Sequence, residues 1–349
     1  MDVHEVRAAV DTVLDDFFTA KGIAAGQSEL RGLTEMLRTF TAEGKRLRPL
    51  LCAVGWRAVG GAGDRDALLY VAACLELFHS FALIHDDVMD RSATRRGRPT
   101  VHRAFAERHP ATAAPGRCER FGENAAILLG DLALVWSDEL LLAGDMTRSQ
   151  ALAVMPLVAE MRTELMLGQY LDLRATGEMT ADVEATLQVN RFKTAKYTIE
   201  RPLHIGAALA GADEGAMDAF SRYALPLGEA FQLRDDLLGV YGDPQVTGKS
   251  RLDDLREGKR TTLLALALRA ADPRQAARLR ALVGQPDLDE EGGEAIRSVL
   301  AATGARQAVE RMIEDRREQA LRALEASPFT PEAIRVLADI AVTATVRNS

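Results

Sequence analysis

Apolar residues recur at intervals of three and four along most of the chain, in stretches rich in Ala and Leu. This spacing places them on one face of a helix. It predicts helices over residues 67–91, 125–143, 149–174, 181–210, 215–241 and 261–270. Strand-like alternation is nearly absent, and the one candidate, residues 237–242, continues the helical pattern before it. The sequence therefore predicts an all-α protein.

Turns that contain Gly and Pro separate these stretches, for example at residues 60–63 and 96–99. None of them is a long linker rich in Ser, Gly and Pro of the kind that joins domains. A length of 349 residues by itself suggests about two domains, whereas the short turns favour one. We expect residues 1–349 to form a single large helical bundle.

Charge and composition narrow the possible functions. The chain has 43 Lys and Arg against 51 Asp and Glu, a net charge of −8, which disfavours a nucleic-acid partner. The N-terminal region lacks the layout of a signal peptide, and its uninterrupted apolar stretches are shorter than the ~18 residues of a membrane span. The three Cys residues show no metal-ligand spacing, which fits thiols in a reducing compartment. We expect a cytoplasmic protein without stable membrane insertion.

A polar stripe follows the apolar helix predicted over residues 67–91. Its positions on one face are Glu76, His79, Asp86 and Asp90. Asp87 lies next to this stripe, and the loop over residues 91–100 adds four Arg residues. A solvated acidic helix end and a network of salt bridges are two interpretations. A third is a magnesium–diphosphate site, because Mg²⁺ binds carboxylates together with phosphate oxygens and Arg donates paired hydrogen bonds to phosphate.

A second acidic motif lies in residues 231–243, where Gln232, Asp235 and Asp236 occur at helical spacing among apolar residues. Gly239 stands where another Asp would complete a second DDxxD motif. Two acidic helix ends that face each other across a cavity are suited to hold a cluster of divalent ions.

Basic residues occur at three further places: before the helix predicted to begin near Pro49, within the helix predicted over residues 181–210, and after the second acidic motif. They are Lys45, Arg46, Arg48, Lys193, Lys196, Lys249 and Lys259. Each alone is typical of a solvated surface, but together they balance the carboxylates of a strongly charged pocket. Residues 242–250 resemble a phosphate-binding loop, yet five residues separate the two glycines where that motif requires four. His79 and His85 are out of register for a shared zinc ion.

Taken together, these motifs resemble those of the polyprenyl synthetase family, the trans-isoprenyl diphosphate synthases. The segments GKRLRP, ELFHSFALIHDDVMDRSATRRGRPT, GQYLD, KT, FQLRDD and DDLREGKRTT follow the family's order between about Thr41 and Leu268. The resemblance implies a bundle of long helices around a deep central cavity, usually in a homodimer. It implies an enzyme that joins an allylic diphosphate to isopentenyl diphosphate with Mg²⁺, in a cluster of about three ions.

The resemblance also assigns roles to residues at matching positions. The metal ligands, which with Lys193 form the catalytic set, would be Asp86, Asp87, Asp90, Asp235 and Asp236. The residues that contact the allylic diphosphate or its departing pyrophosphate would be Arg95, Lys193, Thr194, Gln232, Lys249 and Lys259. Those that hold isopentenyl diphosphate would be Lys45, Arg48, His79 and Arg96. Three further polar residues are interpreted as supporting these side chains: Glu76, Gln169 and Asp172.

Product length is predicted from the residues one turn before the first acidic motif, which form the floor of the growing chain in this family. Here they are Phe81 and Ala82. A bulky residue at the fifth position before Asp86 resembles the geranylgeranyl diphosphate synthases, with a twenty-carbon product. Farnesyl diphosphate and longer polyprenyl diphosphates are the alternatives. A class I terpene cyclase and an inactive regulatory subunit are more distant ones, and the presence of an isopentenyl diphosphate motif argues against the cyclase.

Two features depart from the family pattern or add to it. Gly239 leaves metal binding in the second motif to Asp235 and Asp236, and we expect activity to survive this change. Residues 105–123 are interpreted as a surface loop without an evident role.

Overall fold

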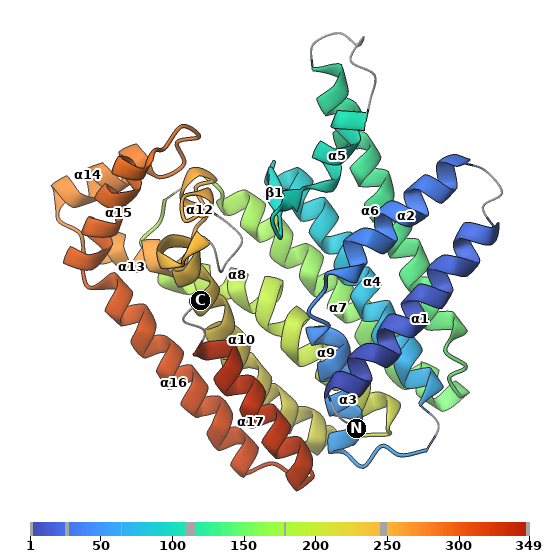
Figure 1. Ribbon diagram of the computed structural model, residues 1–349. Coiled ribbons are helices and arrows are strands. Elements are labelled where there is room, and N and C mark those ends of the chain that lie inside the picture. The colour runs from blue at the N-terminus through green and yellow to red at the C-terminus, as the bar shows by residue number, and fades with distance from the viewer. Residues whose placement is uncertain are drawn as a thin grey trace.

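The computed structural model describes residues 3–24, 28–63, 65–108, 116–177, 179–244 and 250–346. Helices make up almost all of the regular structure in these ranges (Figure 1). The first helices are α1 (Val3–Ala24), α2 (Ser28–Ala42), α3 (Leu47–Ala58), α4 (Asp66–Met89), α5 (Val101–Arg108), α6 (Arg117–Ala143), α7 (Arg148–Ala175) and α8 (Val183–Asn190). The later ones are α9 (Arg201–Leu209), α10 (Glu214–Tyr241), α12 (Asp253–Arg256), α13 (Thr262–Ala270), α14 (Pro273–Leu282), α15 (Glu290–Ala302), α16 (Ala305–Glu325) and α17 (Pro331–Thr345). The prediction of an all-α protein is confirmed.

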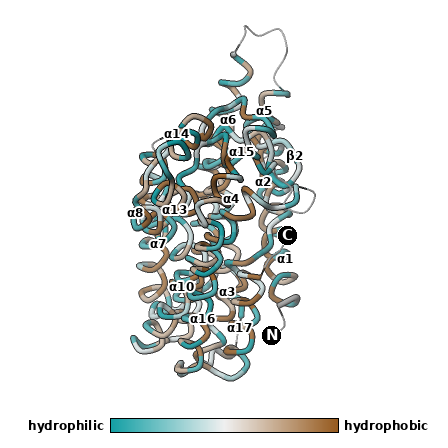
Figure 2. The backbone as a smooth tube through the Cα atoms, turned by 90° about the vertical axis from the view of Figure 1, so that its left-hand side faces the viewer, coloured by the Kyte–Doolittle hydropathy of each residue, from teal (hydrophilic) through white to brown (hydrophobic). Residues whose placement is uncertain are grey.

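The predicted helices are present, and local sequence explains where several begin. Asp213 precedes α10, and its Oδ1 accepts a hydrogen bond from the backbone N–H of Ala216 at 2.8 Å. Thr147 and Gln150 form a reciprocal capping box at the start of α7. α10 continues to Tyr241, so the strand-like stretch near its end is helical. Figure 2 shows most helices as a mixture of hydrophobic and hydrophilic residues, as expected of helices with one buried face.

The helix predicted over residues 181–210 contains an irregular middle. α8 passes without a break into a π-helical segment, Arg191–Glu200, which passes into α9. π-Helical turns are rare and are frequent at functional sites. The segment includes Lys193 and Thr194. Apolar spacing could not predict it, because a π-helical turn inside an α-helix leaves the pattern on either side unchanged.

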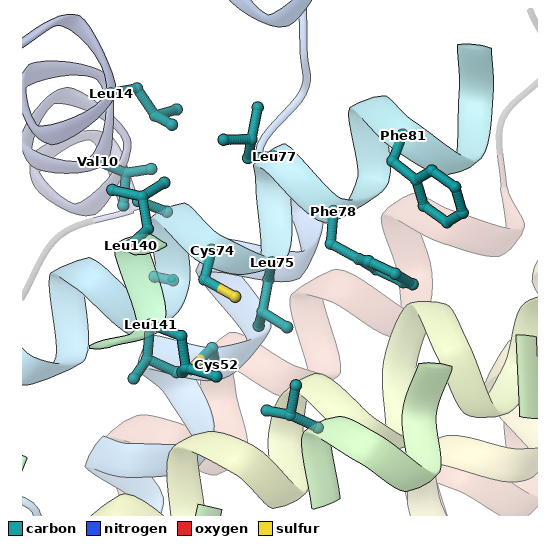
Figure 3. Packing of buried hydrophobic residues seen from close by; sticks show 14 of the residues in the cluster. Val10, Leu14, Cys52, Cys74, Leu75, Leu77, Phe78, Phe81, Leu140 and Leu141 are labelled. Atoms are coloured by element: carbon teal, nitrogen blue, oxygen red, sulfur yellow. The ribbon is translucent and has the colours of Figure 1, made fainter. Parts of the chain in front are cut away.

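α4 is the central helix of the N-terminal half. It packs on α6, α3 and α1, and its side chains Leu75, Leu77 and Phe78 are fully buried (Figure 3). Burial of each such side chain contributes roughly 1.5–3 kcal/mol. α4 is also long and apolar enough to cross a membrane, which the sequence analysis did not expect, but 67% of its most apolar window is buried inside the protein. A core helix passes the same test of length and composition.

α10 has the corresponding place in the C-terminal half, where it packs on α16, α17 and the π-helical segment. Figure 1 shows the orange and red C-terminal helices on one side of the molecule and the blue N-terminal helices on the other. A small hairpin, β1 (Thr94–Arg95) with β2 (Arg98–Pro99), follows α4 and is the one sheet among the described residues. The first acidic motif lies where α4 ends at Met89, and the second lies shortly before α10 ends at Tyr241, so both motifs lie near the C-terminal ends of these helices.

The prediction of a surface loop over residues 105–123 is wrong at both of its ends. Residues 105–108 finish α5, and residues 117–123 begin α6. α5 packs along α6, and Phe105 contacts the main core cluster, so burial of an apolar face stabilises helix here. Residues 109–115 lie outside the described residues.

Candidate active site

The carboxylates of the first acidic motif are neutralised by cations. Asp87 has a side chain only 1% exposed, and Arg95 Nε donates hydrogen bonds to both of its oxygens, at 2.9 and 2.8 Å. Asp86 Oδ1 accepts a hydrogen bond from Lys193 Nζ at 3.1 Å, and its Oδ2 lies 3.6 Å from Arg95 Nη2. Burial raises the pKa of Asp86, but Lys193 and Arg95 outweigh burial and lower it below its usual value. Asp86 is therefore held in its charged form.

Lys259 lies between the first motif and α12. Its Nζ is 3.8 Å from Asp90 Oδ2 and 3.1 Å from Asp254 Oδ1. Burial and the neighbouring charge of Asp86 raise the pKa of Asp90 to about 6. Burial also opposes the charge of Lys259, but Asp254 and Glu257 outweigh it and raise the pKa of Lys259 well above its ordinary value. This lysine is a fixed positive charge at the site.

The second acidic motif is joined to the π-helical segment by a chain of hydrogen bonds. Thr194 Oγ1 donates to Gln232 Oε1 at 2.7 Å, and Gln232 Nε2 donates to Asp236 Oδ1 at 2.8 Å. Asp236 is only 6% exposed, and its Oδ2 has no hydrogen-bond partner. Burial raises the pKa of Asp236 to about 8, and the charges of Asp235 and Asp254 add to this effect against the hydrogen bond from Gln232. Asp235 is exposed.

Two consecutive residues of the π-helical segment connect the motifs. Lys193 reaches Asp86 on α4 and also donates to Asp172 Oδ2 on α7 at 2.6 Å. Thr194 reaches Gln232 on α10. Burial lowers the pKa of Lys193, and the two carboxylates outweigh burial and raise it. The structure thus brings both residues, which the family resemblance assigns to the allylic diphosphate, into contact with residues of the acidic motifs.

A second group of cations surrounds His79. His79 Nδ1 lies 3.2 Å from Tyr197 Oη, and the Arg48 guanidinium stacks on the Tyr197 ring at 4.1 Å from its centroid. Arg48 Nη2 donates to Thr198 Oγ1 at 2.7 Å. Burial lowers the pKa of His79 well below its ordinary value, and the charges of Arg48 and Arg95 lower it further. The neutral imidazole lies in a positive environment that favours an anion.

Of the other two residues assigned to isopentenyl diphosphate, the structure places Arg96 near His79. Arg96 occupies the hairpin turn with a φ of 52°, and its charge is one of those that lower the pKa of His79. Burial and the charge of Arg95 lower the pKa of Arg96 itself. Lys45 is exposed and lies in the loop before α3, which carries Arg48.

Two of the three residues interpreted as supporting the site contact it directly. Gln169 Nε2 donates to Asp86 Oδ1 at 3.1 Å, and Asp172 holds Lys193. Glu76 instead contacts Arg46 behind the site, and this ion pair is buried. Gln169 and Asp172 lie one turn apart on α7, so one face of that helix supports the first motif.

Three residues that contact site residues were not selected from the sequence: Tyr197, Thr198 and Asp254. Tyr197 and Thr198 follow the KT motif by a few positions, and this closeness was the one available signal. Lys196, by contrast, forms an ion pair with Glu164, away from the acidic motifs. Lys249 lies outside the described residues.

The floor position lies on α4 before Asp86. The Phe81 ring is 5.3 Å from the Phe78 ring and 4.7 Å from the His85 ring. Figure 3 shows the side chains of Phe78 and Phe81 on the same side of the helix. Phe81 is 8% exposed, and Ala82 is partly buried against the same core. Neighbouring rings therefore restrict the movement of Phe81.

The donor set fits Mg²⁺. The candidate ligands are Asp86, Asp87, Asp90, Asp235 and Asp236. They offer hard carboxylate oxygens, and the buried Oδ2 of Asp236 has no hydrogen-bond partner. Within the described ranges, no three His, Cys, Asp or Glu side chains are already grouped to hold one ion. Such grouping is not required, because Mg²⁺ often takes one or two carboxylates and completes its shell with phosphate oxygens and water.

The fold and this site define the protein as an all-α enzyme of the isoprenoid synthase type. The family model described as polyprenyl synthetase matches residues 31–300, and the chain belongs to this family of trans-prenyltransferases. Geranylfarnesyl diphosphate synthase of Aeropyrum pernix is 34% identical over 77% of this chain and 79% of its own. Octaprenyl diphosphate synthase of Escherichia coli is 33% identical over 86% and 85%.

Solved structures show the same similarity. A geranylgeranyl pyrophosphate synthase from Corynebacterium glutamicum, complexed with isoprenyl diphosphate and magnesium, is 39% identical with a TM-score of 0.94. The match covers 100% of both chains. The relatives make products of several lengths, so family membership establishes the type of reaction and leaves the product to be argued from the site.

Proposed function

We propose that the chain is a geranylgeranyl diphosphate synthase. It condenses dimethylallyl, geranyl or farnesyl diphosphate with isopentenyl diphosphate, head to tail, and releases pyrophosphate. The observation that carries the proposal is that two groups of basic side chains lie next to each other. In the first, Lys193 lies beside Asp86, and in the second, Arg48 lies beside the neutral His79. Arg95 contacts Asp86 and also lowers the pKa of His79, so the two groups are neighbours. Two diphosphates require two such groups, whereas a terpene cyclase binds one diphosphate.

The residues divide the chemistry between them. Arg95, Lys193 and Lys259 bind the allylic diphosphate, and their charges stabilise the pyrophosphate as it leaves. The carboxylates of the two acidic motifs would hold Mg²⁺, about three ions in our proposal, which would neutralise further charge on the leaving group. Cleavage of the carbon–oxygen bond to pyrophosphate leaves an allylic cation, and Arg48 and His79 orient isopentenyl diphosphate so that its double bond attacks this cation. The resulting cation then loses a proton, which the released pyrophosphate can accept, to form the new double bond. The apolar residues of α4 exclude water from these cations.

The proposed product is the twenty-carbon diphosphate, on the evidence of Phe81. Its ring is fixed between Phe78 and His85, below the motif that binds the allylic diphosphate. A chain that extends along α4 from Asp86 meets this ring. The geranylgeranyl diphosphate synthases among the similar proteins support the same length.

The experiment incubates the purified chain with Mg²⁺, labelled isopentenyl diphosphate and, in turn, each of the three allylic diphosphates. We expect geranylgeranyl diphosphate as the main product by chromatography. A farnesyl or longer product would overturn the assigned length. The absence of any elongated product would contradict the proposal, and cyclised hydrocarbon from an allylic diphosphate alone would indicate a cyclase.

We further propose that the enzyme is a homodimer through α6 and α7. Most of the large apolar side chains exposed in the described residues lie on these two helices, including Leu128, Leu142 and Leu152, which are 67%, 75% and 69% exposed. Arg162 Nη1 donates to Asp138 Oδ1 at 2.6 Å and joins the two helices. An apolar surface of this kind is typical of a protein interface. Light scattering should give twice the chain mass, and a Leu128→Asp/Leu142→Asp double variant should shift it toward the monomer.

We also propose that the chain is one domain and is located in the cytoplasm. The similar Corynebacterium glutamicum structure covers all of this chain, which supports one domain over residues 1–349. Cys52 and Cys74 are buried, Cys118 is partly exposed, and none of the three forms a disulfide, which supports a reducing cytoplasmic location. Limited proteolysis that released two stable fragments would contradict the single domain.

A further inference from the structure

Gly239 and Asp254 are in direct contact at the second acidic motif. A methyl group in place of the Gly239 hydrogen would lie 3.0 Å from Asp254 Cγ and would overlap its Oδ2. Gly239 follows Asp235 by four positions and Asp236 by three, so it is a neighbour of both on the surface of α10. The carboxylate of Asp254 therefore lies where the side chain of a third motif residue would begin.

Asp254 reaches this place from a different element. It belongs to α12, and its side chain is 18% exposed. The absence of a side chain at Gly239 opens the space that the carboxylate fills. In a chain with Asp at this position, the two carboxylates would compete for the same volume and repel each other.

A second observation points to a ligand at this place. Asp236 is 6% exposed, and its Oδ2 is a buried oxygen without a hydrogen-bond partner. A buried polar atom of this kind is costly unless a partner binds it. The neighbouring Gln232 occupies only Oδ1. The carboxylate of Asp254, against Gly239, and the buried Oδ2 of Asp236, one turn earlier, therefore lie at the same end of α10.

We propose that Asp254 supplies the second metal motif with the carboxylate that Gly239 lacks. The inference rests on the magnesium-binding role proposed above for Asp235 and Asp236. The motif is then assembled from α10 and α12 rather than from α10 alone. The competing explanation is that Asp254 acts only through Lys259, which lies 3.1 Å from Asp254 Oδ1.

Metal binding is measured directly, without turnover. Mn²⁺ is titrated into the full-length chain with inorganic pyrophosphate present, and free Mn²⁺ is counted by electron paramagnetic resonance. We expect Asp254→Asn to weaken the affected Mn²⁺ site about 10-fold or more. Asp253→Asn is the matched control, because Asp253 is next in sequence and its Oδ1 lies 3.7 Å from Arg256. Equal Mn²⁺ binding by the two variants would overturn the inference.

A transfer of the carboxylate tests the geometry. Gly239→Asp combined with Asp254→Ala moves the charge onto α10 and empties the space that the new side chain needs, and we expect Mn²⁺ binding to return to within about threefold of the unmodified chain. Gly239→Asn with Asp254→Ala has nearly the same shape without the charge and should not recover. If the first double variant also fails to recover, Asp254 acts through Lys259 and the inference is wrong.

Asp235→Asn separates this inference from the proposed function. If Asp235→Asn weakens Mn²⁺ binding and Asp254→Asn does not, the metal site stands and the role of Asp254 is overturned. If neither substitution changes Mn²⁺ binding, the proposed metal role of the second motif is itself wrong. Circular dichroism of each variant shows whether the fold is intact.

Discussion

Arg46 Nη1 donates a hydrogen bond to Glu76 Oε1 at 2.8 Å, and both side chains are 4% exposed. Arg46 also donates to Asp11 Oδ1 and to the carbonyl oxygen of Thr41, both at 2.6 Å. One side chain thus joins α1, the end of α2 and α4. Because Arg46 directly precedes α3, it also fixes the start of the helix that carries Arg48.

Glu76→Gln should reduce the free energy of unfolding by about 2 kcal/mol, because the buried Arg46 guanidinium loses one of its two carboxylate partners and keeps Asp11. The KM for isopentenyl diphosphate should rise more than that for the allylic diphosphate, since Arg46 adjoins the segment with Arg48. Urea unfolding and steady-state kinetics measure the two effects. Glu43→Gln is the control: its pair with Arg98 is exposed, and its loss should cost less than about 1 kcal/mol. Equal stability of the two variants would contradict the prediction.

Substitutions at the floor should change product length in opposite directions. Phe81→Ala removes the ring below the first motif, and we expect products longer than geranylgeranyl diphosphate. Phe81→Leu is the milder test if the cavity left by Ala, which costs about 3–5 kcal/mol, prevents folding. Ala82→Phe should shorten the product by narrowing the same space. Chromatography of labelled products measures all three, and unchanged length in both Phe81 variants would show that the floor lies elsewhere.

Local pattern predicted much of this fold and part of the site. Helical spacing is a property of neighbouring residues, so α4 and α10 could be predicted from the sequence. The family motifs similarly identified Asp86 and Lys193, which the structure brings into contact. The contact of Asp254 with Gly239 could not be predicted, because it depends on how α12 folds back onto α10.

The contacts around His79 could not be predicted from local sequence either. Its partner Tyr197 is 118 positions away, and nothing in the spacing of either segment connects them. The resemblance supplied a role for His79 but no reason for its neutral state. That reason is burial together with the charge of Arg48, which both depend on tertiary packing.

The three cysteines should differ sharply in reactivity. Cys52 and Cys74 are buried in the core around α4 (Figure 3), and burial raises the pKa of both thiols, that of Cys74 to about 12. Cys118, near the start of α6, is partly exposed. Because the thiolate is the reactive form, only Cys118 should react with a disulfide reagent in the native protein. All three should react in denaturant, and Cys118→Ser should abolish the native reaction. Rapid native labelling of Cys74 would contradict the burial.

The neutral His79 should contribute less to stability as the pH drops below about 6.5. The folded chain lowers the pKa of His79, while the unfolded chain leaves it at its ordinary value, so the unfolded state binds a proton that the folded state does not. The contribution of His79 to the free energy of unfolding therefore rises with pH through this window and levels off above it. Burial lowers the pKa values of His102 and His204 as well, and both act in the same direction as His79. The raised pKa values of Asp90 and Asp236 act in the opposite direction, because the folded chain holds protons on these carboxyl groups that the unfolded chain has lost.

Urea unfolding at pH 5.5 and 7.5 tests this effect. One buried His contributes up to about 1.4 kcal/mol per pH unit to the free energy of unfolding at pH 7.5 minus that at pH 5.5. Asp90 and Asp236 contribute with the opposite sign, so His79 is tested by comparing the unmodified chain with a variant.

His79→Gln removes the titrating ring and keeps a polar side chain beside Tyr197, so this pH 7.5 minus pH 5.5 value should fall by about 1 kcal/mol. His204→Gln should lower the same pH 7.5 minus pH 5.5 value by a separate amount, because His204 and His79 share no hydrogen-bond partner. A pH dependence that His79→Gln leaves unchanged would mean that His79 is protonated in the folded protein and that the Arg48 group does not exclude a positive charge.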